Sequence, residues 1–235
     1  MKKHISFSSP VLLLGICFLA SCSKDVNPEP SGDIPNSVDL GLSVNWSSCN
    51  LGAVEPEGLG GYYQWAGSED VTPREFYLNW SNCPYHMGTS SSYGFTKYNS
   101  NPSYGTVDNK TVLDPGDDVA NVELGGNWRM PTGAEWAELI DNCTWTWGRY
   151  NGVYGYTVVS KKPGYTDKSI FLPAAGCRYI YYYSGVGSGG SYWSSSLSTD
   201  APCDASSLYF ISDNVMMRAY NRYYGFSVRP VEQKN

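Results

Sequence analysis

Histidine and positive charge are scarce in this sequence. The 235 residues include 2 His, and 16 Lys and Arg stand against 22 Asp and Glu, which gives a net charge of −6. An acidic chain without a basic cluster is a poor partner for nucleic acid or for anionic lipid, because both bind through many Lys and Arg contacts. No Cys-x-x-Cys or Cys/His spacing of the kind found in zinc sites is present.

Apolar runs are also short. The run from Val11 to Ala20 is too short to span a bilayer as a helix, and it follows the positive segment 1–4. It ends in Leu19-Ala20-Ser21-Cys22, which resembles the bacterial lipobox, whose Cys is diacylated before cleavage. We therefore expect a signal peptide over 1–21 and a lipid anchor at Cys22, with palmitate as one acyl chain. The alternative is an ordinary secretory signal with a chance Cys.

The residues after the anchor indicate the destination. Ser23 stands where inner-membrane lipoproteins of Gram-negative bacteria carry Asp, and Ser23-Lys24-Asp25 resembles the export signals of bacterial surface lipoproteins. We expect an outer-membrane location, on the cell surface. Residues 22–37 are rich in Pro and lack an apolar period, so they read as a tether. Residues 38–235 are long enough for a single domain with a core of its own.

The number of cysteines after the expected anchor is odd: the five are Cys49, Cys83, Cys143, Cys177 and Cys203. At least one of the five stays free or pairs between chains. Export permits disulfides without requiring them. The sequence leaves their connectivity and the oligomeric state open.

The clearest predicted helix covers about 132–142. Thr132 and Glu135 have the spacing of a capping box, in which each side chain satisfies an N–H at the helix start. Trp136 begins an apolar face that continues at Leu139, Ile140 and Cys143. Glu135 and Glu138 could be read as paired acids of a glycosidase, but a capping role and a place on the polar face account for them.

Most of the remaining chain reads as short strands and long loops. Alternation and turn residues predict a hairpin around Asn151-Gly152, a dipeptide suited to positive φ. The 67–112 segment is a long loop, which is unusual unless it is functional or clamped by side chains. Asp114 and Pro115 begin a helical turn. The predicted strands cover 38–46, 62–66, 144–147, 154–159, 169–173, 192–195, 207–211 and 224–229.

Four motifs stand in a characteristic order: Val38 to Trp46, Trp128-Arg-Met-Pro-Thr132 with Glu135-Trp136, Tyr192-Trp-Ser-Ser-Ser196, and Gly225-Phe-Ser-Val-Arg-Pro230. Together they resemble the Fibrobacter-type major paralogous domain of exported bacterial lipoproteins. That family is similar to the C-type-lectin-like fold of formylglycine-generating enzymes. The resemblance implies an α+β domain with short, twisted, mostly antiparallel strands, one main helix and long loops.

The same resemblance disfavours the enzymatic activity. Formylglycine-generating enzymes use a pair of cysteines, whereas Ser194 stands at the position of the first thiol and only Cys203 lies between it and Gly225. The sugar-binding motifs of calcium-dependent lectins are also absent. We therefore expect a protein that is not an enzyme and needs no cofactor.

Other candidate sites have simple structural explanations. His86 is the one histidine beyond the leader, and it lies in a Pro- and Gly-rich loop where a surface role is the simpler interpretation. Asp114, Asp117 and Asp118 could place oxygens around calcium, but capping and a solvated acidic turn explain them as well.

The late part of the chain is rich in Tyr, Ser and Gly, a mixture that suits binding surfaces. We expect one exposed aromatic surface there, because neighbours on a strand face opposite sides and because the related fold binds ligands through this segment. The predicted function is a non-catalytic recognition module for glycan or protein at the cell surface. The alternatives are a structural or fimbria-like envelope component and an enzyme with an unrecognised hydrolase or oxidase site. The residues predicted for the surface are Tyr181, Tyr182, Tyr183, Tyr192, Trp193, Tyr220 and Tyr223.

Overall fold

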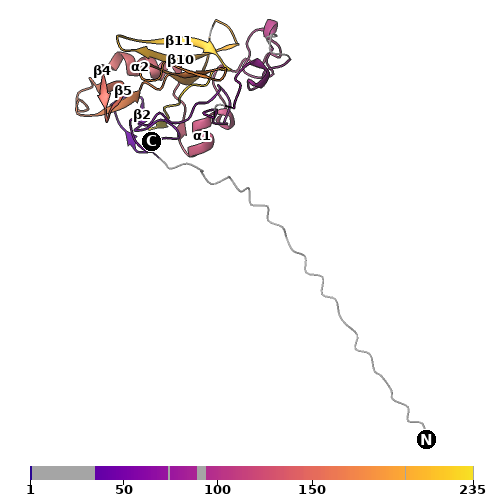
Figure 1. The fold of residues 1–235 in the computed structure, drawn as a ribbon, viewed down its shortest axis with the longest axis horizontal. Coiled ribbons are helices and arrows are strands. Elements are labelled where there is room, and N and C mark those ends of the chain that lie inside the picture. Colours follow the sequence, from indigo (N-terminus) through magenta and orange to yellow (C-terminus); the bar gives the residue numbers. More distant parts are fainter. Residues whose placement is uncertain (2–34, 74, 89–93, 199, 235) are drawn as a thin grey trace.

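A computed structural model describes residues 1, 35–73, 75–88, 94–198 and 200–234 (Figure 1). Apart from Met1, the expected signal peptide, Cys22 and the tether up to residue 34 lie outside the described residues. Among the described residues, no helix has the length and apolarity that crossing a bilayer requires.

The described chain is mostly β, with small antiparallel sheets and two α-helices, of which one is the main helix. A four-stranded sheet has the order β1 (Ser37–Val38), β2 (Val44–Ser47), β12 (Val231–Gln233), β3 (Trp128–Arg129). Two three-stranded sheets have the orders β11 (Asn214–Asn221), β10 (Asp204–Ile211), β9 (Gly189–Leu197) and β4 (Cys143–Tyr150), β5 (Val153–Ser160), β6 (Ser169–Pro173). A two-stranded ribbon pairs β7 (Cys177–Tyr179) with β8 (Tyr182–Ser184).

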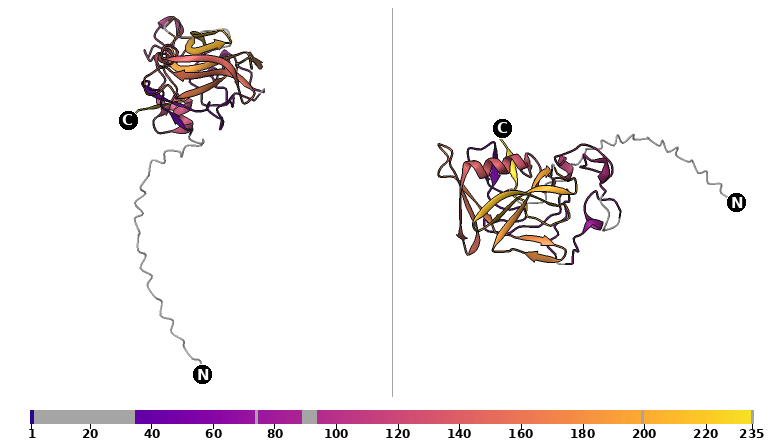
Figure 2. Two further views of the ribbon diagram at one scale, coloured as in Figure 1. Left: turned by 90° about the vertical axis from the view of Figure 1, so that its left-hand side faces the viewer. Right: turned by 90° about the horizontal axis from the view of Figure 1, so that it is seen from above.

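The predicted helix is confirmed as α2 (Gly133–Asn142). Thr132 is its N-cap, and both bonds of the capping box with Glu135 are present. The α2 helix packs across β9, β10 and β11 (Figure 2). Trp136 is fully buried there, 4.7 Å from the ring of Trp46, and its Nε1 donates to the Trp193 carbonyl oxygen at 3.2 Å. The second helix, α1 (Val119–Leu124), is short.

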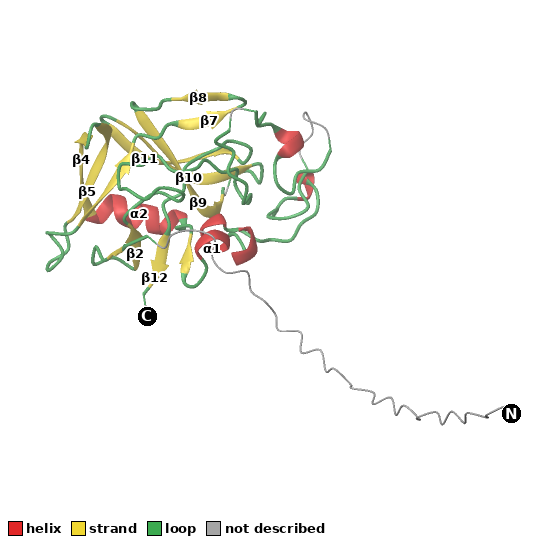
Figure 3. Cartoon of the chain, turned by 60° about the horizontal axis from the view of Figure 1, so that its bottom comes forward, coloured by secondary structure: helices red, strands yellow, loops and turns green. Residues whose placement is uncertain are grey.

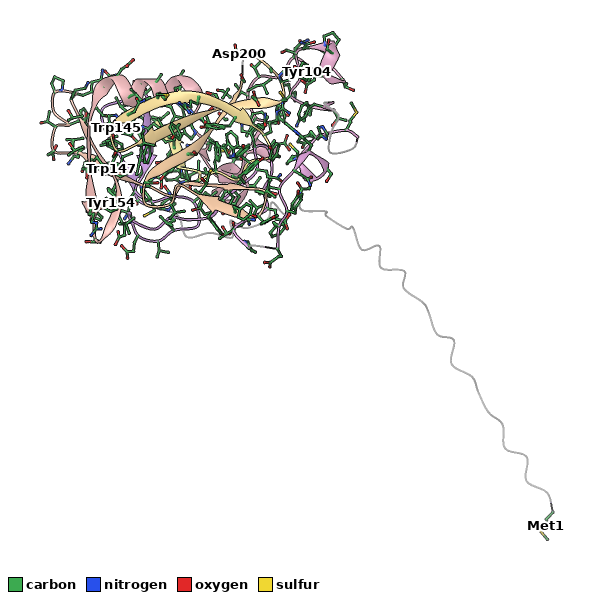
Figure 4. All side chains as sticks on the ribbon, turned by 45° about the horizontal axis from the view of Figure 1, so that its top comes forward. Met1, Tyr104, Trp145, Trp147, Tyr154 and Asp200 are labelled. Atoms are coloured by element: carbon green, nitrogen blue, oxygen red, sulfur yellow. The ribbon has the colours of Figure 1, made fainter. Side chains whose placement is uncertain are left out.

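The predicted hairpin is also confirmed, and its strands are longer than expected. The β4 and β5 strands join at Asn151 and Gly152, whose φ angles of 47° and 87° are the positive values that this turn requires. Trp145, Trp147 and Tyr154 lie along this hairpin, at the end of the domain far from Tyr104 (Figure 4). The β6 strand has the predicted bounds.

The single strand predicted over 38–46 is wrong, although its burial pattern is right. The backbone turns at Gly41, where φ is 71° and a Cβ would lie 2.5 Å from the ring of Tyr165. This turn separates β1 from β2, yet four of the five alternate residues are buried and Val38 is half-buried; the four are Leu40, Leu42, Val44 and Trp46.

The strands predicted over 62–66 and 224–229 are single bridges instead. Tyr63 and Phe226 exchange backbone hydrogen bonds of 2.9 and 3.0 Å, but neither segment forms a continuous strand. The β11 and β12 strands were not predicted. The β12 strand pairs with β2 and β3, which are far away in the sequence, whereas β11 pairs with its neighbour β10 through a tight hairpin.

Two apolar clusters cover opposite faces of β9 and β10. One contains Tyr192, Leu208 and Phe210 with Trp136, and the other contains Trp193 and Ala205 with Phe226. A sheet that is covered on both faces buries consecutive residues, as buried parallel sheets do.

Fully buried arginines hold the long loops. The Arg178 guanidinium donates to backbone carbonyls within 71–76, and that of Arg222 donates to the carbonyls of 97–98. Arg229 donates to Asn50 Oδ1, the Ser47 carbonyl and the Phe171 carbonyl at 2.7–3.0 Å. Burial lowers the pKa of Arg222 and of Arg229 to about 10. The 67–112 segment is therefore clamped by side chains, which was one of the two explanations expected for its length.

The chain enters and leaves the domain at one place, because β1 and β12 both pair with β2. The β7–β8 ribbon lies at the opposite side of the domain from β12 and the C-terminus (Figure 3).

Candidate functional site

The β7–β8 ribbon decides where the three adjacent tyrosines point. Tyr182 is paired with Tyr179 and Tyr183 with Arg178, so the first pair shares one face of the ribbon and the second pair shares the other. Tyr182 is 57% and Tyr181 46% exposed. Tyr183 faces inward, where its hydroxyl donates to the Thr72 carbonyl and its ring contacts Arg178. Two of the three tyrosines are thus available to a ligand.

The assignment of Tyr192 and Trp193 to an exposed surface is wrong. Both side chains are 0% exposed. Tyr192 packs in one core cluster and Trp193 in the other, because the two clusters lie on opposite faces of β9. Alternation exposes one of two neighbours only when one face of the sheet is open, and at these two positions both faces are covered.

Tyr220 and Tyr223 are half-buried, and they belong to a row of tyrosine rings that contact one another. Tyr224 is the centre of this row: its ring lies 4.8 Å from that of Tyr179, 5.0 Å from that of Tyr223 and 5.8 Å from that of Tyr220. Tyr209 continues the row beyond Tyr220 at 6.3 Å. We call the half-buried and exposed rings together the tyrosine face: Tyr179, Tyr181, Tyr182, Tyr209, Tyr220, Tyr223 and Tyr224.

Sequence reasoning missed three members of this face. Tyr209 lies between Leu208 and Phe210 on β10, so simple alternation would have placed it opposite these buried residues. Tyr224 directly follows Tyr223, and no sequence signal marks it. Tyr179 is detected only through its register with Tyr182.

A hollow of about 240 Å³ opens beside the tyrosine face. Tyr209 and Tyr220 form part of its lining, and the rest comes from the ends of β7–β10 and the connection between β8 and β9. Gly185 and Gly187 in this connection have φ angles of 75° and 78°, which only glycine adopts without strain. No charged side chain lines the hollow: its residues are Gly176, Cys177, Ser184, Gly185, Ser188, Gly189, Gly190, Ser191, Tyr209, Ile211 and Tyr220.

The chemistry of the hollow is that of hydrogen bonding and ring contact. Burial raises the pKa of the Cys177 thiol to about 11, so that this thiol is neutral and a weak nucleophile at neutral pH. The Arg218 guanidinium lies 4.6 Å from the centre of the Tyr209 ring. Ser and Tyr hydroxyls donate and accept hydrogen bonds, and the ring faces take apolar or C–H groups.

The three aspartates considered for calcium do not converge. Asp118 is buried as the N-cap of α1, where its carboxylate accepts hydrogen bonds from the backbone N–H of Ala120 and Met130. Asp114 and Asp117 instead pair with Lys97. Within the described ranges, no three His, Cys, Asp or Glu side chains are arranged to hold a metal ion. The helical turn expected at Asp114 is a 3₁₀ turn (Pro115–Asp117), and Asp114 gives it no side-chain cap.

The remaining candidates are each engaged elsewhere. The His86 ring packs 5.3 Å from that of Trp80 and 5.4 Å from that of Phe95. Glu135 binds Arg129, whereas the Glu138 carboxylate accepts hydrogen bonds from Ser43. The two acids therefore serve different contacts and do not act as a pair.

In comparisons with known proteins, no protein-family profile, curated protein or solved structure matches the chain. The family resemblance inferred from the motifs therefore stays a prediction. The tyrosine face and its hollow offer a ligand both aromatic rings and hydroxyl groups.

Proposed function

We propose that this protein is a non-catalytic recognition module that binds a glycan or a protein through the tyrosine face. The observation that supports it is the row of Tyr179, Tyr224 and Tyr220 beside a neutral hollow rich in hydroxyl groups. Tyrosine gives a large, rigid contact area at a small cost in conformational entropy, and Ser and Gly adapt their hydrogen bonds to the ligand.

The proposal includes a lipid-anchored location in the outer membrane, on the cell surface. The expected anchor at Cys22 precedes β1, and β1 joins the small sheet that also contains β12. The β7–β8 ribbon lies on the far side of the domain from that sheet (Figure 3). A domain tethered at one side would present the tyrosine face away from its attachment.

We further infer a C-type-lectin-like fold of the Fibrobacter-type major paralogous domain. Supporting features are the capped helix that starts at Thr132, the small antiparallel sheets and the long clamped loops. The late position of the tyrosine face in the chain agrees with the ligand surface of that fold.

A binding array tests the function directly. The purified full chain is applied to glycans and surface proteins, and hits are titrated with single variants. Tyr209→Ala should weaken binding by more than about 2 kcal/mol, as expected for an anchor residue, because Tyr209 lines the hollow. Tyr223→Ala should have a smaller effect, because Tyr223 is not part of that lining.

Tyr150→Ala is the matched control, because Tyr150 is 42% exposed on the β4–β5 hairpin and lies outside the tyrosine face. Equal losses for Tyr150→Ala and Tyr209→Ala would contradict the proposed site. Concentration-dependent self-assembly without any array hit would favour the structural envelope component instead.

A further inference from the structure

Arg218 differs from the other three arginines in the last third of the chain. Arg178, Arg222 and Arg229 are fully buried and donate to backbone carbonyls. Arg218 is exposed on β11, which is the edge strand of its sheet (Figure 1). It therefore holds no loop in this way, and its charge remains accessible to a ligand.

The strand register places Arg218 on the same side of the sheet as the hollow beside the tyrosine face. On β11, Arg218 is two residues from Tyr220, and it is paired with Ser207, which is two residues from Tyr209 on β10. Side chains two residues apart point to the same side of a strand. Tyr209 and Tyr220 both line the hollow, so Arg218 lies at its rim.

Three neighbours position the Arg218 guanidinium. Its carbon lies 4.6 Å from the centre of the Tyr209 ring, its Nη1 donates to the Tyr220 hydroxyl at 3.4 Å, and its Nε donates to the Met216 sulfur at 3.2 Å. All three neighbours are uncharged, and they leave Nη2 without an acceptor in the described part of the chain. A group that is already oriented loses less conformational entropy when a ligand binds it.

The positive charge of Arg218 is not neutralised by a neighbouring acid. None of the ion pairs among the described residues includes Arg218. Between residues 204 and 221 the carboxylates are Asp204 and Asp213, at the two ends of the hairpin, and Asp204 accepts a hydrogen bond from Asn221. A ligand that complements this part of an otherwise acidic protein carries a negative charge.

The hollow next to Arg218 offers several neutral hydroxyl groups. Ser184, Ser191 and Tyr209 line it, and none of their hydroxyls is hydrogen-bonded to another described residue. Such hydroxyls donate and accept, as the hydroxyls of a sugar ring do. An acidic peptide side chain would use Arg218 and leave these groups to water. The volume of about 240 Å³ is below that of sites for drug-sized ligands, which suits a single ring-sized group.

We propose that the tyrosine face binds a glycan through a hexuronic acid residue, with its carboxylate at Arg218 and its ring at the hollow. This inference rests on the proposed recognition function and specifies the ligand of the same site. A planar guanidinium matches a carboxylate in shape and charge. A neutral hexose lacks the charge, and an acidic side chain lacks the ring hydroxyls.

The test titrates the detergent-solubilised full chain with methyl glucuronide, methyl glucoside and Nα-acetyl-glutamate amide, followed by NMR. The glucuronide should bind about fivefold more tightly than the glucoside, which is the order of one solvated ion pair. This preference should shrink as salt is added, because salt screens exposed charges.

Arg218→Gln should weaken glucuronide binding about fivefold and leave glucoside binding unchanged, since it removes the charge alone. The matched control is Arg149→Gln. Arg149 is also exposed and lies 4.2 Å from the centre of a tyrosine ring, that of Tyr154, but it belongs to the β4–β5 hairpin. This control should change neither affinity.

Equal affinity for the glucuronide and the glucoside would overturn the inference, and so would an unaffected Arg218→Gln variant or the absence of binding by either sugar. Tighter binding of the glutamate probe would also overturn it and would indicate an acidic protein partner. Tyr209→Ala tests the proposed function separately: a neutral glycan or a protein whose binding depends on Tyr209 would leave the recognition function standing without the preference for an acid.

Discussion

Replacing Trp136 by Ala tests whether α2 anchors the fold. The indole is 0% exposed, and its ring contacts those of Trp46 and Tyr192 at 4.7 and 6.0 Å. Truncation of a buried Trp costs about 3–5 kcal/mol. The lost hydrogen bond from Nε1 to the Trp193 carbonyl adds about 1 kcal/mol.

We therefore expect the free energy of unfolding to fall by about 4–6 kcal/mol in total. For a domain of this size, each kcal/mol lowers the Tm by about 2–4 °C. Far-UV circular dichroism during urea and thermal unfolding measures both quantities. Fluorescence is less suitable, because the sequence contains 8 Trp.

Trp136→Phe separates the two contributions, because it keeps most of the apolar volume and removes the N–H donor. Its cost should be clearly smaller than that of the Ala variant. Trp145→Ala is a control at a half-buried position on the adjoining β4 strand, and it should also cost less. An unchanged midpoint for Trp136→Ala would refute the view that packing of α2 on the β9–β11 sheet stabilises the domain.

Three further predictions concern the cap, a charge and the anchor. Thr132→Ala should cost about 1 kcal/mol in chemical unfolding, because the Glu135 N–H loses its acceptor. Burial raises the pKa of Glu135, but hydrogen bonds from the Arg129 guanidinium and the Thr132 N–H lower it more, so the net pKa is below the value of 4.5 for the unfolded chain. Ionised Glu135 therefore stabilises the fold at pH values above 4.5, and this contribution is lost as the pH falls. Glu135→Gln should thus cost about 1–3 kcal/mol at pH 7 and progressively less in acid, and a pH-independent difference would contradict this sign. Cys22→Ser should release the protein from membranes in fractionation, whereas retention through an uncleaved helix would rule out the lipid anchor.

The sequence was sufficient to predict those elements that are fixed by contacts between residues close together in the chain. The capping box of Thr132 and Glu135 fixes the start of α2 through bonds between residues three apart. The Asn151-Gly152 turn fixes the β4–β5 hairpin because both residues adopt positive φ. The burial of alternate residues over 40–46 also followed from the pattern, even though Gly41 bends the chain.

The tertiary structure alone decided which aromatic residues face solvent. Tyr192 and Trp193 are buried because two clusters cover opposite faces of β9, and those clusters come from distant segments. The tyrosine face likewise combines 179–182, Tyr209 and 220–224, and its register depends on pairing across β7 and β8. Buried arginines hold the loops through backbone carbonyls, which carry no sequence signature. The sequence by itself determined the helix and the hairpin, whereas long-range packing determined which tyrosines form the exposed face.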